Sequence, residues 1–275
     1  MAIVNVTPDS FSDGGAAGEG KQAVAYARRR LAEGADFLDV GGESTRPGAA
    51  AVPADEQIRR VVPVIRALAA ETGATLSVDT RSAAVATAAI EVGATLVNDV
   101  SALVHDPAMA AVVAGAGVGV ILMHMRGTPA TMAGHATYDD VVEEVRRELE
   151  ERIDAALRAG IAPARIVVDP GIGFAKTAAQ SFALLAGLPR LTTLGPPVLV
   201  GPSRKSFLAA AAGDRPPAER GPATAAAVAA CVLLGARVVR VHDVAAAVQV
   251  TRVADAIRRA RDVRTGGGAI PAESG

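Results

Sequence analysis

Eight short apolar runs, separated by segments with helical patterns, constrain the fold of this chain more than any other feature. The runs are residues 2–6, 36–40, 75–78, 94–97, 118–123, 165–168, 197–200 and 237–241. Each run is shorter than an ordinary helix and is largely apolar, which is typical of strands that are covered on both faces. Alternation of such strands with helices predicts βαβ units and a parallel sheet.

The segments between the runs carry helix patterns and helix stop signals. The glycines at positions 34, 93 and 160 follow three of the predicted helices, and glycine just past a helix end is the usual left-handed stop. The expected helices are residues 21–33, 55–71 (with Pro63 interrupting the pattern), 81–92, 107–114, 138–159, the Ala-rich segment 222–236, and 244–263.

Eight strand–helix units predict an α/β fold, a closed (β/α)8 barrel (the TIM barrel) in a single domain. A doubly wound open sheet is the alternative, but no G-x-G-x-x-G follows the first strand. We expect the barrel domain to span residues 1–264. Residues 265–275, with the sequence TGGGAIPAESG, are expected to form a flexible C-terminal tail.

Composition excludes several classes of function. The net charge is -1 and aromatic residues make up 3%, so the chain lacks the charge and the stacking surface of a nucleic-acid-binding protein. A single cysteine excludes an internal disulfide and a cysteine-based zinc site. Residues 107–125 carry no charged side chain, but their central glycines favour a helix, a turn and a strand over a membrane span. With no segment that resembles a signal peptide, we expect a cytoplasmic protein without nucleic-acid or membrane partners.

Polar residues follow nearly every apolar run, at the strand ends where barrel enzymes carry their chemistry. Asp79, Asn98 and Asp169 offer acceptors and an amide, a set that suits a planar heterocycle with adjacent N–H donors. One such residue is explained by turn chemistry, but a ring of them around one mouth indicates a ligand site. Asn5, Asp39, Asp99 and His124 also end strands.

A second set of residues near the strand ends is cationic. Arg46, Lys205, Arg240 and His242 lie beside glycine-containing loops, an arrangement that suits phosphate. The two sets together predict a substrate with a polar planar ring at one end and phosphate at the other. Residues 5–15, after the first strand, are rich in turn formers and are interpreted as a mobile lid.

Taken together, eight segments resemble dihydropteroate synthase, a pterin-binding TIM-barrel family of folate biosynthesis that sulfonamides inhibit. The segments are NVTPDSFSDGG (5–15), DVGGESTRPGA (39–49), SVDT (77–80), VNDV (97–100), LMHM (122–125), DPGIGFAK (169–176), SRKS (203–206) and RVHDV (240–244). They occur in family order, and the resemblance covers the chain from Met1 to about residue 262.

The resemblance implies a transferase that condenses 6-hydroxymethyl-7,8-dihydropterin diphosphate with 4-aminobenzoate. The products would be 7,8-dihydropteroate and pyrophosphate, with Mg²⁺ as the cofactor. Negative charge develops on the departing pyrophosphate, where Mg²⁺ and cationic side chains stabilise it. Positive charge left on the pterin methylene can delocalise into the ring, so we expect an SN1-like substitution that needs no protein nucleophile.

The resemblance also implies residue roles. The implied catalytic residues are Lys205, Asp79, Arg240 and His242. Asn5 would ligate Mg²⁺. The apolar side chains of Met123 and Phe174 would pack against the pterin. The complete set of implied substrate-binding residues is Thr45, Arg46, Pro47, Asp79, Asn98, Met123, Asp169, Phe174, Lys205, Ser206, Arg240, Val241 and His242. Within this set, Arg46, Pro47 and Ser206 would shape the 4-aminobenzoate site. His124 is not used as a base in the family, and packing or an inter-loop hydrogen bond is its expected role.

The chain departs from the family pattern in four places. Family members usually carry a short segment before the first strand, which covers the bottom of the barrel, whereas here Met1 aligns with the strand itself. We expect either a lower stability or an exposed apolar patch there. Ala2, Pro202 and Ala223 stand where other residues are usual, but none of them removes a catalytic position.

Three other interpretations compete with this one. They are a related methyltetrahydrofolate methyltransferase, a catalytically silent pterin-binding homologue, and a structural barrel without a ligand. A methyltransferase would not need Lys205, Arg46 and the other diphosphate cations, and a silent copy should have lost them. The family usually forms homodimers through its last helices, and residues 222–236 are compatible with such a contact.

Overall fold

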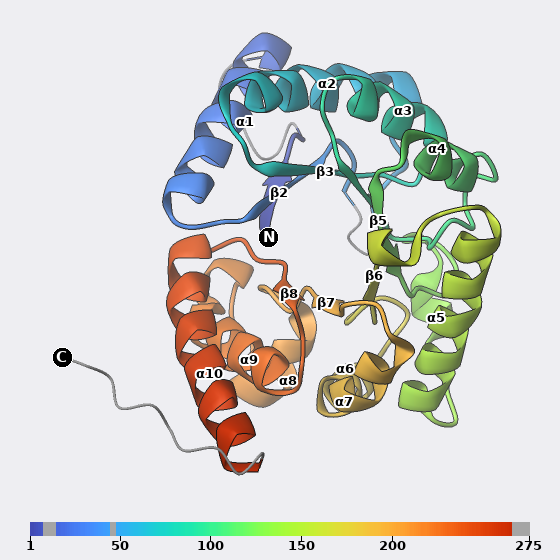
Figure 1. Ribbon diagram of the computed structural model, residues 1–275. Coiled ribbons are helices and arrows are strands. Elements are labelled where there is room, and N and C mark those ends of the chain that lie inside the picture. The colour runs from blue at the N-terminus through green and yellow to red at the C-terminus, as the bar shows by residue number, and fades with distance from the viewer. Residues whose placement is uncertain (8–14, 45–47, 266–275) are drawn as a thin grey trace.

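Eight parallel strands and the helices between them surround a central axis in the computed structural model, which describes residues 1–7, 15–44 and 48–265 (Figure 1). The strands are β1 (Ala2–Asn5), β2 (Phe37–Gly41), β3 (Thr75–Asp79), β4 (Leu96–Asp99), β5 (Gly119–Met123), β6 (Ile166–Asp169), β7 (Leu199–Val200) and β8 (Val238–Val239). Each falls within, or within two residues of, an apolar run of the sequence.

The strands close into a barrel. β1 to β6 pair in chain order as one parallel sheet, and β7 pairs with β8. Single parallel bridges join the two sheets, from Val168 to Val198 and from Ala2 to Val241. At the second seam the Val241 amide donates to the Met1 carbonyl at 3.0 Å. The predicted closed (β/α)8 barrel is therefore confirmed, and the open-sheet alternative is wrong.

The helices form the outer layer of this barrel (Figure 1). They are α1 (Gly15–Ala32), α2 (Ala54–Glu71), α3 (Ala83–Glu91), α4 (Met109–Ala116), α5 (Val141–Arg158), α6 (Ala178–Ala186), α7 (Leu188–Leu191), α8 (Ala209–Ala212), α9 (Gly221–Leu233) and α10 (Val244–Thr265). The sequence placed the start of α1 at residue 21 and gave no helix for α6 to α8. Residues 8–14 of the predicted lid and 266–275 of the predicted tail lie outside the described residues.

Two local features set the ends and the course of the helices. Gly93 has φ +116° just after α3, and a Cβ there would lie 2.5 Å from the Cβ of Ala69, so the predicted stop also allows close packing on α2. α2 itself runs through Pro63 without a break. Its buried face, which includes Val61, Ile65 and Leu68, offsets the hydrogen bond that proline removes.

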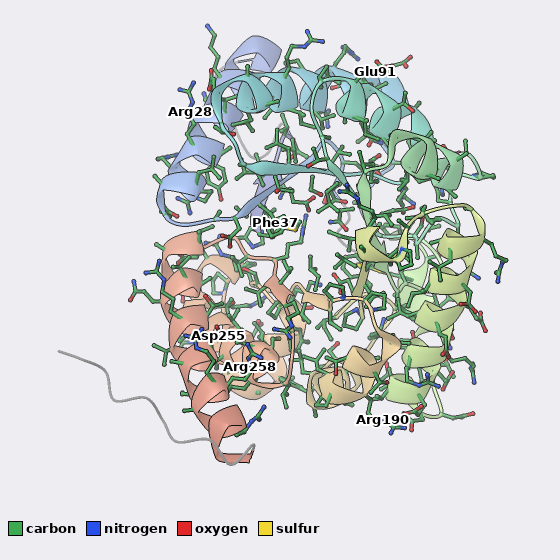
Figure 2. The ribbon with its side chains drawn as sticks, viewed as in Figure 1. Arg28, Phe37, Glu91, Arg190, Asp255 and Arg258 are labelled. Carbon is green, nitrogen blue, oxygen red and sulfur yellow. The ribbon has the colours of Figure 1, made fainter. Side chains whose placement is uncertain are left out.

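The apolar core has two parts. The larger part lies between strands and helices, where α2 and α5 bury one face each. The smaller part fills the barrel interior and comprises Met1, Phe37, Leu96, Ile121, Val167, Leu199 and Val238. Figure 2 shows Phe37 inside the ring of helices, whereas Arg28, Glu91 and Arg190 project from its outer surface. No helix among the described residues has the length and apolar character needed to cross a membrane.

We predict that Leu68→Ala lowers the free energy of unfolding by about 2–5 kcal/mol, because it leaves a cavity under α2. Leu68 is fully buried. The matched control is Leu157→Ala on α5, whose side chain is 39% exposed, and it should change stability by less than about 1 kcal/mol. Urea unfolding measures both variants, and equal losses would contradict the two-layer packing described here.

Candidate active site

The barrel interior is layered, and the layering positions the polar site residues. Side chains alternate between the two faces of a strand, so the residue two positions after an interior residue also faces the interior. Five residues lie two positions further along their strands than a residue of the apolar layer in the barrel interior. They are Asp39, Asn98, Met123, Asp169 and Arg240. The site thus sits directly above an apolar floor, at the carboxyl ends of the strands.

Arg240, immediately after β8, joins two carboxylates on neighbouring strands. Its Nε donates to Asp39 Oδ2 at 2.7 Å, and a terminal nitrogen donates to Asp79 Oδ2 at 2.8 Å. Asn98 Nδ2 donates to the same Asp39 oxygen at 2.9 Å. Asp79 lies in register with Asn98 on β4 and with Gly41 on β2. These four polar side chains form a continuous hydrogen-bonded network on one side of the mouth.

Burial and charge act against each other in this network. Burial raises the pKa of Asp79 to about 7, although the Arg240 guanidinium opposes the shift. Burial disfavours the Arg240 cation too, but Asp39 and Asp79 outweigh it and raise the pKa of Arg240 above its usual range. Arg240 is therefore a permanent cation, while Asp79 is a carboxyl group that can accept a proton near neutral pH.

Lys205 lies on the other side of the mouth, in the loop after β7. Its ammonium donates to the carbonyl of Ile172 and lies 4.6 Å from the centre of the Phe174 ring. Burial lowers the pKa of Lys205 to about 8, and the carboxylate of Asp169 opposes that shift. Lys205 is thus held between the main chain and an aromatic face of the loop that follows β6.

Asp169 ends β6 beside Met123, its partner in register on β5. Its Oδ1 accepts a hydrogen bond from the Gly171 amide at 2.7 Å. Burial raises the pKa of Asp169, and the positive charge of Lys205 is the strongest opposing influence. The Asp169 carboxyl group and the Lys205 ammonium interact electrostatically, although the hydrogen bond of the ammonium goes to the Ile172 carbonyl. The depth of the mouth therefore offers a carboxyl acceptor, an ammonium donor and two apolar walls, Met123 and Phe174.

His242 lies near Ser203, in the segment that follows β8. Its Nδ1 lies 3.0 Å from Ser203 Oγ, and its backbone amide donates to the same oxygen at 3.2 Å. Ser203 is buried and fixes the ring from the loop after β7. Val241, by contrast, is buried in the seam between β8 and β1, and Ser206 is exposed.

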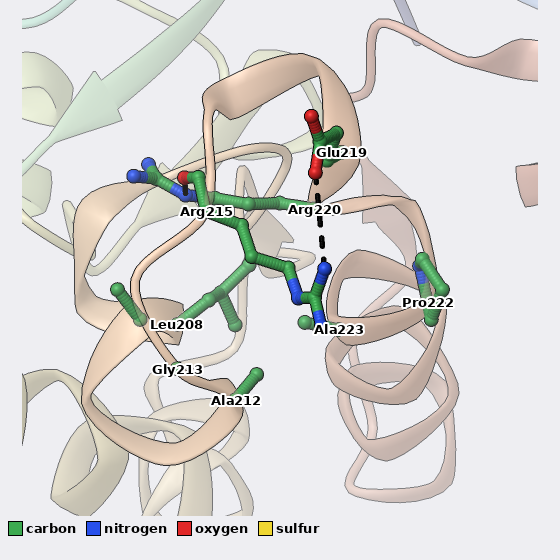
Figure 3. A pocket seen from close by; sticks show the side chains of 9 residues that line it. Leu208, Ala212, Gly213, Arg215, Glu219, Arg220, Pro222 and Ala223 are labelled. Atoms are coloured by element: carbon green, nitrogen blue, oxygen red, sulfur yellow. Dashed lines mark hydrogen bonds and ion pairs between the residues drawn. The ribbon is translucent and has the colours of Figure 1, made fainter.

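The loop that carries Lys205 is held by hydrogen bonds to α9 and to the residue directly before it. Arg204 has φ +59°, a left-handed conformation that side chains disfavour, and its amide donates to Thr224 Oγ1 at 3.1 Å. Arg220 donates to the Arg204 carbonyl at 3.0 Å and to the Arg215 carbonyl at 2.8 Å. A cavity of about 280 Å³ lies beside Arg220, between α8 and α9 (Figure 3). It is separate from the mouth, since none of the strand-end carboxylates lines it.

The predicted residues divide into those that the described part of the chain brings together and those that it does not describe. Asp79 and Arg240 are in direct contact, and Asn98 is joined to Arg240 through Asp39. Lys205 and Phe174 are also in direct contact. Asn5 ends β1, half-buried, in register with Gly41. Thr45, Arg46 and Pro47 lie outside the described residues.

Two residues that contact the predicted site residues were not assigned a role from the sequence. Asp39 was noted only as a strand end, yet it accepts hydrogen bonds from both Arg240 and Asn98. Ser203 was noted only as part of a loop. The period-two pattern contained a signal for Asp39, because it lies two positions after Phe37, an interior residue of the same strand.

Comparison with known proteins identifies the family. Residues 1–242 match the family described as pterin binding enzyme. Dihydropteroate synthase from Mycobacterium leprae is 48% identical over 262 residues, covering 93% of this chain and 92% of the relative. The chain belongs to the dihydropteroate synthases.

Solved structures of dihydropteroate synthases share the fold over nearly the whole chain. The enzyme from Xanthomonas albilineans with 4-aminobenzoic acid is 50% identical with a TM-score of 0.88, covering 94% of this chain and 92% of that one. The enzyme from Yersinia pestis with a sulfonamide drug is 42% identical with a TM-score of 0.89, covering 94% of both chains. The resemblance inferred from the motifs is confirmed.

We predict that Arg240→Met destabilises this dihydropteroate synthase by about 3–5 kcal/mol at pH 8, because two buried carboxylates lose their cation. The loss should be smaller at pH 5.5. Asp79 has a folded-state pKa of about 7, above its unfolded value of 3.8, so between these values the folded state binds the extra proton. Arg240 lowers this pKa in the parent, so its removal raises the pKa of Asp79 further, and lowering the pH favours the folded variant more than the folded parent.

Urea unfolding at the two pH values measures this difference. The matched control is Arg237→Met, which removes an exposed arginine three residues earlier. Equal losses for Arg240→Met at both pH values would show that Asp79 does not take up a proton in the folded state.

Proposed function

We propose that this chain catalyses the dihydropteroate synthase reaction through the barrel mouth described above. The reaction condenses 6-hydroxymethyl-7,8-dihydropterin diphosphate with 4-aminobenzoate to give 7,8-dihydropteroate and pyrophosphate. One observation carries the proposal. The Asp79–Asn98–Arg240 network and the Asp169–Lys205 pair converge from five strand ends on one mouth. The activity named for the relatives supports it.

The pterin ring would lie between the two sides of the mouth. Asp169 and Asp79 offer carboxyl oxygens to the N–H groups of the ring, and the Lys205 ammonium can donate to its carbonyl or ring nitrogen. Met123 and Phe174 cover its faces, and the planar guanidinium of Arg240 gives a further stacking surface. This arrangement would satisfy the polar edge of the heterocycle with side chains that are themselves buried, such as Asp79 and Asp169.

The diphosphate would lie toward the rim, beside Arg240 and His242. Asn5 fits a role as a Mg²⁺ ligand, because its amide oxygen is a hard donor at the same mouth, and Mg²⁺ usually takes only one or two protein ligands besides water and phosphate oxygens. When bound, Mg²⁺ would neutralise charge on the diphosphate. Arg240 and His242 would stabilise the same charge from the protein side as it develops.

The substitution at the pterin methylene needs no nucleophile from the protein. The C–O bond breaks with its electron pair leaving on pyrophosphate, and the cation left on the methylene delocalises into the ring. The lone pair of the aryl amine then forms the new C–N bond, and the nitrogen loses a proton. The contribution of the chain is to orient both substrates and to stabilise the leaving group.

The second substrate would bind at the outer part of the mouth. Arg46, Pro47 and Ser206 are proposed to shape this site, and Thr45 to contact the pterin substrate. The relatives bound to 4-aminobenzoic acid and to a sulfonamide drug support a shared site for these two compounds. Sulfonamides would then compete with 4-aminobenzoate.

We also propose that two copies of the chain pair through α9 and α10. These helices pack on each other, and α10 exposes Val253 and Ile257, one turn apart, at 62% and 54%. A pair of exposed apolar side chains on one helix face supports a protein contact there. The cytoplasmic location stays a prediction from the sequence.

We predict that Lys205→Ala lowers the rate of pyrophosphate release by at least about 100-fold, because the pterin loses a charged donor that is aligned in the pocket. The assay contains dihydropterin diphosphate, 4-aminobenzoate and Mg²⁺. Lys21→Ala, on the exposed surface of α1, is the matched control and should retain the parental rate. A near-parental rate for Lys205→Ala would refute its assigned role.

We predict that Asn5→Ala raises the Mg²⁺ concentration needed for half-maximal activity, because a protein ligand of the ion is lost. Binding of 6-hydroxymethyl-7,8-dihydropterin, which carries no diphosphate, should not change. A metal titration of turnover measures the first effect and calorimetry measures the second. An unchanged titration curve would contradict metal binding by Asn5.

A further inference from the structure

Three ionisable side chains that the proposed reaction does not use form a partly buried, hydrogen-bonded chain beside the mouth. They are His124, directly after β5, Lys176, at the end of the loop after β6, and Glu148, on α5. Lys176 Nζ lies 2.9 Å from His124 Nδ1, and His124 Nε2 lies 2.8 Å from Glu148 Oε2. The expected inter-loop hydrogen bond of His124 is thus present, and it extends through two further groups.

The hydrogen-bond partners fix the protonation of this chain. The hydrogen bond from His124, together with Arg126, lowers the pKa of Glu148 to about 2, so Glu148 is a carboxylate that can only accept. His124 must therefore carry its proton on Nε2. Burial lowers the pKa of His124 to about 4, so the ring is neutral and its Nδ1 is an acceptor. Lys176 is the donor to that nitrogen.

Lys176 also ties its own loop to the end of β5. Its ammonium donates to the Phe174 carbonyl at 2.9 Å and approaches the His124 carbonyl at 3.5 Å. Gly171 touches the same segment, since a Cβ at this position would lie 2.0 Å from the His124 carbonyl oxygen. The His124 amide donates to the Asp169 carbonyl at 2.9 Å. The loop is therefore fastened to β5 at both of its ends.

The opposite side of this loop faces the proposed pterin pocket. The Ile172 carbonyl accepts the hydrogen bond of Lys205, and the Phe174 ring lies against the same ammonium. Ala175, between Phe174 and Lys176, has φ +49°, a conformation that an alanine disfavours and that needs support from its surroundings. The hydrogen bond from Lys176 to the Phe174 carbonyl gives that support at the residue that carries the ring.

We propose that Lys176, held by His124 and Glu148, is a positioning residue for the pterin substrate. It sets the Asp169–Lys176 loop so that Phe174 and Lys205 meet the ring in one geometry, and it does not touch the substrate itself. This inference rests on the proposed function, because it assigns the pterin to the pocket between Asp79 and Asp169.

The experiment compares Lys176→Met with Lys21→Met, a matched change at an exposed lysine on α1. Methionine keeps the apolar stem and removes the donors. Calorimetry with 6-hydroxymethyl-7,8-dihydropterin should show about tenfold weaker binding for Lys176→Met, the effect expected for one lost hydrogen bond. Burial lowers the pKa of Lys176 to about 7, and its nitrogen donates hydrogen bonds in either protonation state. KM for the pterin diphosphate should rise by a similar factor, whereas KM for 4-aminobenzoate should stay at the parental value. Lys21→Met should match the parent in all three.

A double-mutant cycle tests whether Lys176 acts through the loop. Phe174→Leu weakens pterin binding by itself, and adding Lys176→Met should cost less than the sum of the two changes, because both act on the same ring. Asp79→Asn, on the other side of the mouth, should combine additively with Lys176→Met. Additivity with Phe174→Leu would overturn the proposal.

His124 gives an independent pair of variants, which also covers the case in which Lys176→Met does not fold. His124→Gln keeps an acceptor for Lys176 and a donor for Glu148, so it should retain most of the pterin affinity. His124→Leu removes both and should lose about as much affinity as Lys176→Met. Equal affinities for the two His124 variants, or parental affinity in a folded Lys176→Met, would overturn the proposal. If the parent binds the pterin but releases no pyrophosphate, the proposed function fails while this test of positioning still applies.

Discussion

The rest of the site depends on the Arg240 guanidinium, which lies between two buried carboxylates. A single side chain from β8 reaches past β1 to β2 and β3 and neutralises charge that the interior would otherwise disfavour. The same contact bridges the β8–β1 seam of the barrel, where one isolated bridge joins the strands. One ion-pair network, above the apolar layer of the barrel interior, therefore contributes both to the closure of the barrel and to the assembly of the pocket.

The two sides of the mouth are positioned in different ways. Asp79, Asn98 and Asp39 belong to strands, so the register of the parallel sheet fixes their spacing. Lys205 and Phe174 belong to loops, which have no ladder of hydrogen bonds to hold them. Partly buried contacts replace the ladder there, from Arg220, directly before α9, and from Lys176 beside His124. A barrel with variable loops can keep a precise site only where such contacts support the loops.

Local patterns in the sequence gave the strands and most of the helices. The runs of apolar residues were long enough to mark every strand, and glycine stops marked the helix ends at positions 34, 93 and 160. α7 and α8, with four residues each, are too short to show a periodic apolar face. α6, with nine residues, was missed as well. Thr177 and Gln180, which form a capping box at the start of α6, were the available signal. α1 begins six residues before its predicted start, in a segment whose glycines are poor helix formers.

The sequence alone determined which polar groups stand at the ends of the strands, because strand-end residues and family motifs are local and can be recognised along the chain. It also determined the closed barrel, since eight strand–helix units have few other ways to bury their apolar faces. Only the tertiary structure decided which groups meet. Asp39 and Arg240 lie 201 positions apart, and Lys176 and His124 lie 52 apart. Their contacts arise from the closure of the barrel and from the packing of its loops. Local patterns along the sequence do not show which distant residues such packing brings together.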